Sequence, residues 1–310
     1  MINGVIDRDG NTWTVQEALD KSLEIGFPKS FITAAVKYGN RKWNGKPHPT
    51  DIVNCPRQAA LKYTEDYPIY LDKTVDSMIG TSMHRFFVTG DEVYANVKVE
   101  NDIMNGELDL IEVVDGSLIL YDFKVVKSYP VKKALGFYTD KETVLDEDGE
   151  PVRFKSGKRK GEIKTRNVTK QDYAKRDVKA YTRQLNIYRY LYETGSISNM
   201  PGIYSDNKIH EMFIFQLLKE AGRIAAENGI IHSSYRVPIP KVDLDLVKDF
   251  IEEKSIPIYV YLENNGPLPP IPTDPDDVWE GRLCTGFCPV AHICNKDGKN
   301  PYLTQTEDEE

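Results

Sequence analysis

Asp122 and Lys124 stand two residues apart in a segment, residues 118–126, that is otherwise rich in apolar side chains. On a β-strand, alternate side chains point to the same face, so a strand here places Asp122 beside Lys124 and turns Phe123 away. Asp109 lies on the preceding segment and joins them if the two strands pair in register. Two carboxylates and an ammonium group are costly to assemble unless a divalent cation and a phosphate lie between them. The pattern therefore points to phosphodiester hydrolysis.

A simpler explanation is that the pair consists of two solvated charges on an exposed strand, which is common. Asp122 and Lys124 interrupt an apolar run, however, and this favours burial. Buried charges are rarely left without a compensating group. The hairpin alone leaves a functional site and a structural salt bridge about equally favoured.

The elements that must position these residues are a hairpin and two helices. Residues 106–114 and 118–126 are predicted strands, and Asp115-Gly116 between them is a strong two-residue turn signal. Residues 80–87 are a predicted helix that carries a single histidine, His84. Taken alone, a histidine among apolar neighbours is more often a core residue than a metal ligand.

A second predicted helix carries Gln184 and Tyr188. It starts near Thr169, which forms a capping-box pattern with Asp172, and it stops at Gly195. The i, i+4 spacing places Gln184 and Tyr188 on the same face. Core packing explains the apolar stripe of this helix. Packing explains Gln184 less easily.

The order of these motifs resembles the PD-(D/E)XK nuclease superfamily in its RecB-like branch. The matching motifs are Gly-x-x-x-His, Gly-x-x-Asp, Asp-x-Lys and Gln-x-x-x-Tyr, which occupy residues Gly80 to His84, Gly106 to Asp109, Asp122 to Lys124, and Gln184 to Tyr188. One departure is the second acidic residue, which is Asp122 where Glu is also frequent in the family. The resemblance implies an α/β fold of restriction-endonuclease type, with a mixed central sheet flanked by helices.

The resemblance also implies roles for these residues in a metal-dependent DNA exonuclease. His84, Asp109, Asp122 and the backbone carbonyl of Phe123 would bind Mg2+ or Mn2+. Lys124 would position or deprotonate the attacking water, or stabilise charge in the transition state. Gln184 and Tyr188 would orient the substrate strand or Lys124.

The chain has four cysteines, Cys55, Cys284, Cys288 and Cys294. Two disulfides are the simplest use, but a chain without a signal peptide is expected to be cytoplasmic and reduced. Zinc prefers two close pairs of thiolates, so one distant cysteine plus a cluster of three is a poorer match. This division resembles the iron–sulfur exonucleases, which are AddB-like and have CRISPR-associated and phage relatives. The resemblance implies a [4Fe-4S] cluster that staples the two ends of the domain, although the spacing of Cys284 and Cys288 is one residue longer than usual.

The domain organisation predicted from the sequence is one nuclease domain with additions. It comprises a helical N-terminal extension (1–49), a nuclease domain closed by the cysteine cluster (50–295), a basic insertion within that domain (153–179) and an acidic tail (296–310). Hydrophobic residues make up 40% of the chain and charged residues 28%, which is enough for a core. No apolar run is long enough to cross a membrane, and no phosphate-binding loop of a nucleotide-driven motor is present.

The net charge of −8 is unusual for a DNA enzyme, but the positive charge is concentrated locally. Residues 153–179 hold far more lysine and arginine than acidic residues, and 155–161, after a predicted hairpin turn at Asp148-Gly149, is the densest part. Such a run is most often a solvated loop, but here it is well placed to contact phosphates. Arg57, directly after Cys55 and Pro56, is expected either to contact phosphate or to pair structurally.

The remaining segments are predicted from their local patterns. They are a helix at 15–25, strands at 212–218 and 230–237, a helix at 243–262 with a kink or break at Pro257, and an extended proline-rich segment at 267–275.

DNA, as single strands or duplex ends, is the substrate that the resemblance implies, in recombination, repair or phage DNA processing. A recombinase, helicase or integrase is the expected protein partner, and a homo-oligomer is a further expectation. Two alternatives stay open. One is a nuclease that trims spacer precursors in CRISPR adaptation, and the other is a non-catalytic DNA-end binding partner.

Overall fold

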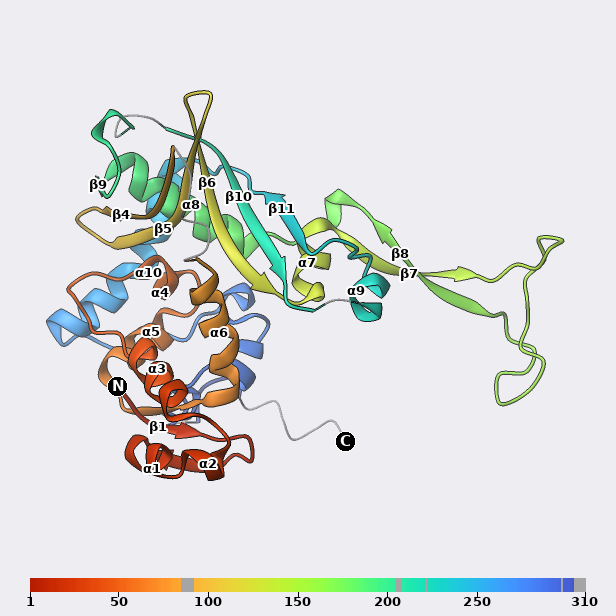
Figure 1. The fold of residues 1–310 in the computed structure, drawn as a ribbon, viewed down its shortest axis with the longest axis horizontal. Coiled ribbons are helices and arrows are strands. Elements are labelled where there is room, and N and C mark those ends of the chain that lie inside the picture. The colour runs from red at the N-terminus through yellow and green to blue at the C-terminus, as the bar shows by residue number, and fades with distance from the viewer. Residues whose placement is uncertain (85–91, 205–207, 221, 297, 304–310) are drawn as a thin grey trace. The chain divides into compact units, whose positions relative to one another are not determined.

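The computed structural model describes residues 1–84, 92–204, 208–220, 222–296 and 298–303, which fold into two compact units (Figure 1). The first unit comprises Met1–Asp122, Ala180–Met212 and the chain from Pro240 onward. The second comprises Phe123–Lys179 and Phe213–Ile239. Within the described residues, no helix is both long and apolar enough to cross a membrane.

The N-terminal part of the first unit is a small sheet surrounded by helices. Its strands β1 (Ile2–Ile6), β2 (Thr12–Thr14) and β3 (Tyr67–Tyr70) are ordered β2-β1-β3. The helices are α1 (Val15–Asp20), α2 (Ser22–Ile25), α3 (Lys29–Gly39), α4 (Pro49–Ile52), α5 (Pro56–Thr64) and α6 (Leu71–His84). The predicted helix at 15–25 is thus two short helices that meet at Lys21.

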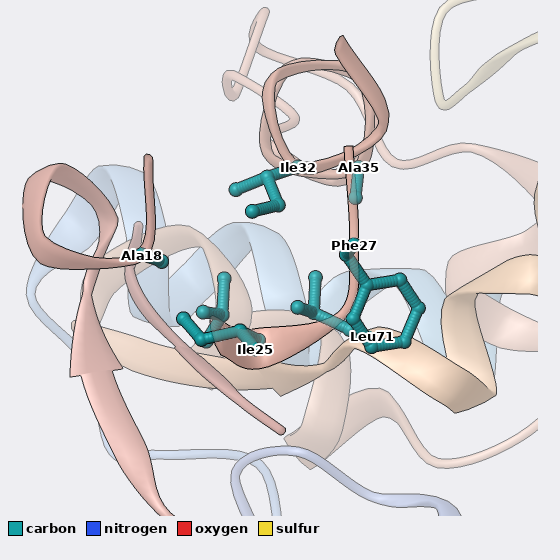
Figure 2. Packing of buried hydrophobic residues seen from close by; sticks show 7 residues of the cluster. Ala18, Ile25, Phe27, Ile32, Ala35 and Leu71 are labelled. Carbon is teal, nitrogen blue, oxygen red and sulfur yellow. The ribbon is translucent and has the colours of Figure 1, made fainter. Parts of the chain in front are cut away.

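Apolar side chains from this sheet and these helices form a core of their own. Figure 2 shows its buried residues, which are Val5, Ala18, Ile25, Phe27, Ile32, Ala35 and Leu71. Burying such side chains stabilises the unit by roughly 1.5–3 kcal/mol for each large one. The core fixes α6 against α3 and β1, and α6 is the helix that ends at His84.

The central sheet is mixed, has six strands and is flanked by helices, as predicted. Its strands are β4 (Val93–Glu100), β5 (Asn105–Val114), β6 (Ser117–Val126), β9 (Ser196–Ser198), β10 (Ile209–Leu218) and β11 (Ser234–Pro238). Their order is β11-β10-β6-β5-β4-β9. The predicted strand at 230–237 begins later, at Ser234. The Asp115-Gly116 turn is confirmed, because both residues have positive φ angles, 49° and 74°, as a tight two-residue hairpin turn requires.

Helix α8 (Lys179–Thr194) approaches strand β5, where its Leu191 lies against Gly106. It ends before Gly195 as predicted, but the predicted start near Thr169 is wrong. Thr169 belongs to strand β8 and pairs with Thr139, and the Asp172 side chain accepts a hydrogen bond from the backbone N–H of Ala174 in a short 3-10 turn. A polar pattern that resembles a helix cap therefore ends a strand here.

The C-terminal part of the first unit leads back toward the N-terminal helices. Helix α10 (Leu244–Asn264) continues through Pro257 without ending. An extended proline-rich segment follows, and then the short turns η4 (Pro275–Val278) and η5 (Leu283–Phe287) and helix α11 (Ala291–Cys294). Of the predicted acidic tail, residues 304–310 lie outside the described residues.

The second unit contains a long two-stranded ribbon. Strands β7 (Phe137–Thr143) and β8 (Thr165–Gln171) form the paired base, and isolated bridges at Leu145↔Pro151 and Arg153↔Ile163 continue from it. Helices α7 (Ser128–Leu135) and α9 (Arg223–Glu227) belong to this unit, as do the short turn η2 (Tyr173–Lys175) and parts of β6, β10 and β11. The predicted turn at Asp148-Gly149 is confirmed by the positive φ of Gly149, 83°.

Candidate functional site

The register of β5 and β6 sets Asp109 opposite Asp122. The two strands pair from Val114↔Ser117 to Leu110↔Tyr121, and Asp109 and Asp122 are the next residues on each strand. Directly opposite residues of an antiparallel pair point to the same face, with Cβ atoms about 4.5–5.5 Å apart. The two carboxylates therefore share the face opposite to that of Leu110 and Tyr121, which is the arrangement that the sequence predicted.

Asp122 is almost completely buried, with 2% of its surface exposed. Gln184 on α8 donates a hydrogen bond from Nε2 to Oδ1 of Asp122 at 3.0 Å. The sequence favoured burial of Asp122, and this prediction is confirmed. A buried carboxylate at this position needs polar neighbours or a cation, because its charge is otherwise costly to desolvate.

Tyr188 lies beside both carboxylates. Burial raises the pKa of its phenol, and the negative charges of Asp122 and Asp109 raise it further, while a hydrogen bond with the Gln184 side chain opposes the shift. Tyr188 therefore stays a neutral phenol at neutral pH. Asp109, Asp122, Gln184 and Tyr188, which are drawn from a hairpin and a distant helix, meet in one polar centre of the first unit.

Gly106 allows the helices to approach strand β5 closely. A Cβ atom at this position would lie 3.1 Å from Cγ of Pro49 and 3.3 Å from Cδ1 of Leu191, which is tighter than ordinary packing. Leu191 is on α8, so the absence of a side chain at Gly106 sets how near Gln184 and Tyr188 come to the carboxylates. The glycine of the Gly-x-x-Asp motif is thus explained by the close packing of Pro49 and Leu191 against β5.

The boundary between the two units falls within β6, directly after Asp122. Phe123 is buried and packs edge-on against Phe215, with ring centroids 5.9 Å apart. Lys124 is partly buried. It lies two residues beyond Asp122 on the same strand, so the alternation of a strand turns both side chains to one face.

His84 is the last residue of α6, and its side chain lies outside the described part of the structure, as do residues 85–91. Among the described residues, no group of three or more histidine, cysteine, aspartate or glutamate side chains is placed to hold a metal ion. The carboxylates of Asp109 and Asp122 supply two oxygen ligands of the type that Mg2+ and Mn2+ prefer.

The four cysteines line a single small cavity in the first unit. Cys55 directly precedes α5, while Cys284, Cys288 and Cys294 come from η5, its end and α11. All four are free thiols. The C-terminal segment therefore returns to the N-terminal helices, and this return is what the one-plus-three division of cysteines required.

Hydrogen-bond donors point at the sulfur atoms of this cavity. Nε of Arg57 donates to Sγ of Cys294 at 3.2 Å, and Nδ2 of the buried Asn300 approaches the same sulfur at 3.7 Å. Gln58 donates its backbone N–H to Cys55 and its side chain to Cys288. Arg57 also donates to the carbonyl of Pro269, so of the two expectations for Arg57 the structure bears out the structural pairing.

Burial raises the pKa of the Cys55 thiol to about 12, and the neighbouring cysteines add to the shift. Burial also raises the pKa values of Cys284 and Cys288. Thiols in such surroundings stay protonated unless a cation replaces the proton. Donors aimed at sulfur stabilise the thiolate form, which is the form that binds a metal ion.

Two of these donors were not foreseen from the sequence. Gln58 follows Cys55 by three residues on a helix that Pro56 begins, so the first turn of that helix returns Gln58 to the sulfur. The spacing of Cys55, Pro56 and Gln58 is a local signal for this contact. Asn300 lies in an irregular segment, and its contact with Cys294 has no local signature.

The basic ribbon keeps several of its cations unpaired. Arg159 pairs with Glu162, and Lys170 pairs with Asp140 and Glu142. Within the described residues, three lysines in the densest part of the run are exposed and make no ion pair, namely Lys155, Lys158 and Lys160. These three ammonium groups are therefore available to an anionic partner.

The chain was compared with protein families, curated proteins and solved structures. No protein-family model matches the chain, and no curated protein matches it. The crystal structure of SSO0001 aligns with 86% of this chain and 95% of its own, with 11% sequence identity and a TM-score of 0.39.

Proposed function

We propose that the chain is a metal-dependent DNA exonuclease with a restriction-endonuclease-like core. The observation that carries this proposal is the register that sets Asp109 opposite the buried Asp122, with Gln184 and Tyr188 beside them. Two carboxylates on one face repel each other, so their arrangement is best explained by a cation that they share. DNA is proposed as the substrate class because the motifs resemble those of DNA nucleases, and the phosphodiester groups of DNA can bind such a cation.

His84, Asp109, Asp122 and the backbone carbonyl of Phe123 would hold the ion, Mg2+ or Mn2+. A bound ion of this kind polarises the scissile phosphate and lowers the pKa of a water molecule. Gln184 holds the Asp122 carboxylate in place through its 3.0 Å hydrogen bond. Lys124 stabilises the negative charge that develops on the phosphate, or positions the water. Tyr188, a neutral phenol, orients Gln184 or the strand.

A [4Fe-4S] cluster bound by Cys55, Cys284, Cys288 and Cys294 is part of the proposal. Its support is the shared cavity, the four free thiols and the donors that point at their sulfurs. Zinc prefers thiolates in two close pairs, whereas each cysteine of a four-iron cluster binds a different iron, which suits one distant cysteine with a group of three.

The test is cleavage of end-labelled DNA by wild type, Asp109→Ala and Asp122→Ala in Mg2+, with DNA binding measured in parallel. Both variants should lose at least about 10²-fold in rate and keep their DNA affinity. Asp115→Asn is the matched control, because this exposed carboxylate lies on the same hairpin and Asn tolerates a positive φ. Near-normal cleavage by Asp122→Ala contradicts the proposal, and DNA binding without any cleavage by wild type favours the non-catalytic alternative.

A further inference from the structure

A second cavity, of about 410 Å³, lies in the first unit and has no role in the site above. Its walls come from α3, from the segment that carries Arg41, from α4 and α5, and from α6. The volume falls within the range of small-molecule sites, about 300–1,000 Å³. It is too large for a bare ion and suits a ligand the size of one nucleotide.

Two cations line the cavity, Arg41 and Lys62, against one carboxylate, Asp51. The Asp51 carboxylate is already engaged, because Oδ2 accepts hydrogen bonds from the backbone N–H of His48 and from the hydroxyl of Tyr63, both at 2.9 Å. Arg41 lies 4.0 Å from Asp51 at its closest and donates to Thr50 at 2.8 Å. Most of the donors of the Arg41 guanidinium therefore remain for a ligand.

Lys62 projects from α5 and is partly buried. Among the described residues it makes neither a hydrogen bond nor an ion pair, although Asp51 and Cys288 act on it electrostatically. A lysine held in this way is stabilised by an anion that supplies the acceptors it lacks.

Tyrosine side chains form the remaining distinctive part of the lining. Tyr38 is 56% exposed on the last turns of α3, while Tyr67 is buried on β3. Tyr63 is held by its bond to Asp51 and by an edge contact with Trp43, with ring centroids 5.3 Å apart. Exposed aromatic rings beside cations are the elements with which proteins bind single-stranded nucleic acid, by stacking bases and contacting phosphates.

The cavity and the carboxylate centre belong to the same unit. The positive charge of Arg41 lowers the pKa of Tyr188, whereas the negative charges of Asp122 and Asp109 raise it. Thr74, Ser77 and Met78 of the cavity wall are on α6, the helix that ends at His84. The cavity wall and the histidine of the Gly-x-x-x-His motif thus belong to the same helix.

We propose that this cavity binds one nucleotide of a single DNA strand next to the scissile bond, with its phosphate between Arg41 and Lys62 and its base against a tyrosine. The position of this nucleotide on the strand rests on the proposed function, whereas the binding of a nucleotide does not. The site makes the N-terminal helices part of substrate recognition and favours a frayed or single-stranded end over a paired duplex.

The test measures binding of thymidine 5′-monophosphate and of thymidine to the full chain by calorimetry in EDTA, where no cleavage occurs. Wild type should bind the monophosphate and bind thymidine much more weakly. Arg41→Gln and Lys62→Met should each weaken monophosphate binding about 10-fold or more, because each removes a charge-assisted contact. Lys62→Arg should retain binding. Lys98→Met, an exposed lysine of β4 outside the cavity, is the control.

Equal affinity of wild type and Lys62→Met for the monophosphate, or no measurable binding by wild type, overturns the nucleotide site. Thermal melting of Lys62→Met guards against a folding defect, since an apolar chain of similar length should leave the unit as stable or more stable. The two proposals can be contradicted independently. If cleavage depends on Asp122 but nucleotide binding does not depend on Lys62, only the proposed nucleotide site is wrong. If nucleotide binding depends on Lys62 but no metal-dependent cleavage occurs, only the proposed nuclease activity is wrong.

Discussion

At the scale of single residues, the hydrogen bond from Gln184 to Asp122 connects the helix to the strand. A hydrogen bond to a charged group contributes about 1.5–3 kcal/mol, and this one also fixes the orientation of a buried carboxylate. A glutamine is suited to this role because its amide donates to Asp122 without adding charge. The Tyr188 phenol on the next turn takes part in the same network.

Gln184→Ala should therefore lower the affinity of the protein for the metal ion more than its affinity for DNA. We expect a 10- to 100-fold rise in the Mn2+ concentration needed for half-maximal cleavage, about the usual effect of losing a residue that orients a metal ligand. Gln16→Ala, an exposed glutamine on α1, serves as the control. An unchanged Mn2+ dependence would show that Gln184 only packs.

At the scale of elements, the β5–β6 hairpin was predictable because its signals are local. A two-residue Asp-Gly turn fixes the register, and the register places Asp109 and Asp122 together. The start of α8 was not predictable in the same way. Thr169 and Asp172 look like a helix cap, but the pairing of Thr169 with Thr139 across the ribbon overrides that local preference. The cavity that Arg41 and Lys62 line depends on how separate elements pack, which the spacing of residues does not reveal.

The two motif glycines should respond oppositely to substitution. Gly106→Val forces side-chain atoms toward Pro49 and Leu191 and should destabilise the first unit by about 1–3 kcal/mol. Gly80→Ala meets nothing within 4 Å on α6 and should stabilise it by roughly 0.5–1 kcal/mol. Urea unfolding midpoints measure both. A neutral Gly106→Val would mean that α8 does not need its close approach to β5.

The ribbon of the second unit should contribute to DNA affinity through its unpaired lysines. Replacing Lys155, Lys158 and Lys160 by Ala should weaken binding and flatten its dependence on salt, by nearly one unit of log–log slope for each phosphate that the variant no longer neutralises. Lys241→Ala/Lys248→Ala is a control on exposed lysines elsewhere. An unchanged slope in the triple variant would identify the ribbon as a solvated loop.

At the scale of the whole molecule, the cysteine cavity joins parts of the chain that most of the sequence separates. Closing so long a loop restricts the unfolded chain, and a cluster that closes it adds its binding free energy to folding. The meeting of Cys55 with Cys284, Cys288 and Cys294 could be expected only from the resemblance. Local patterns predict the turns around these cysteines but not their convergence.

Protein purified without oxygen should be brown, with the broad visible absorbance of iron bound to thiolates. Cys55→Ala should lose this colour and melt at least about 5 °C earlier, because the variant lacks both a cluster ligand and the closed loop. Metal analysis, which counts the iron and zinc ions per chain, distinguishes an iron–sulfur cluster from a zinc site. About one zinc and no iron per chain would contradict the cluster and leave the carboxylate site unaffected.

Asp109 and Asp122 are proposed to bind a divalent cation that DNA cleavage requires. The most direct test is the rate of cleavage as Mg2+ or Mn2+ is titrated into metal-free protein. We expect no cleavage in excess EDTA, recovery when either ion is restored, and a rate at least about 10²-fold lower for Asp122→Ala at every concentration. Full activity of the wild type in EDTA would contradict the account.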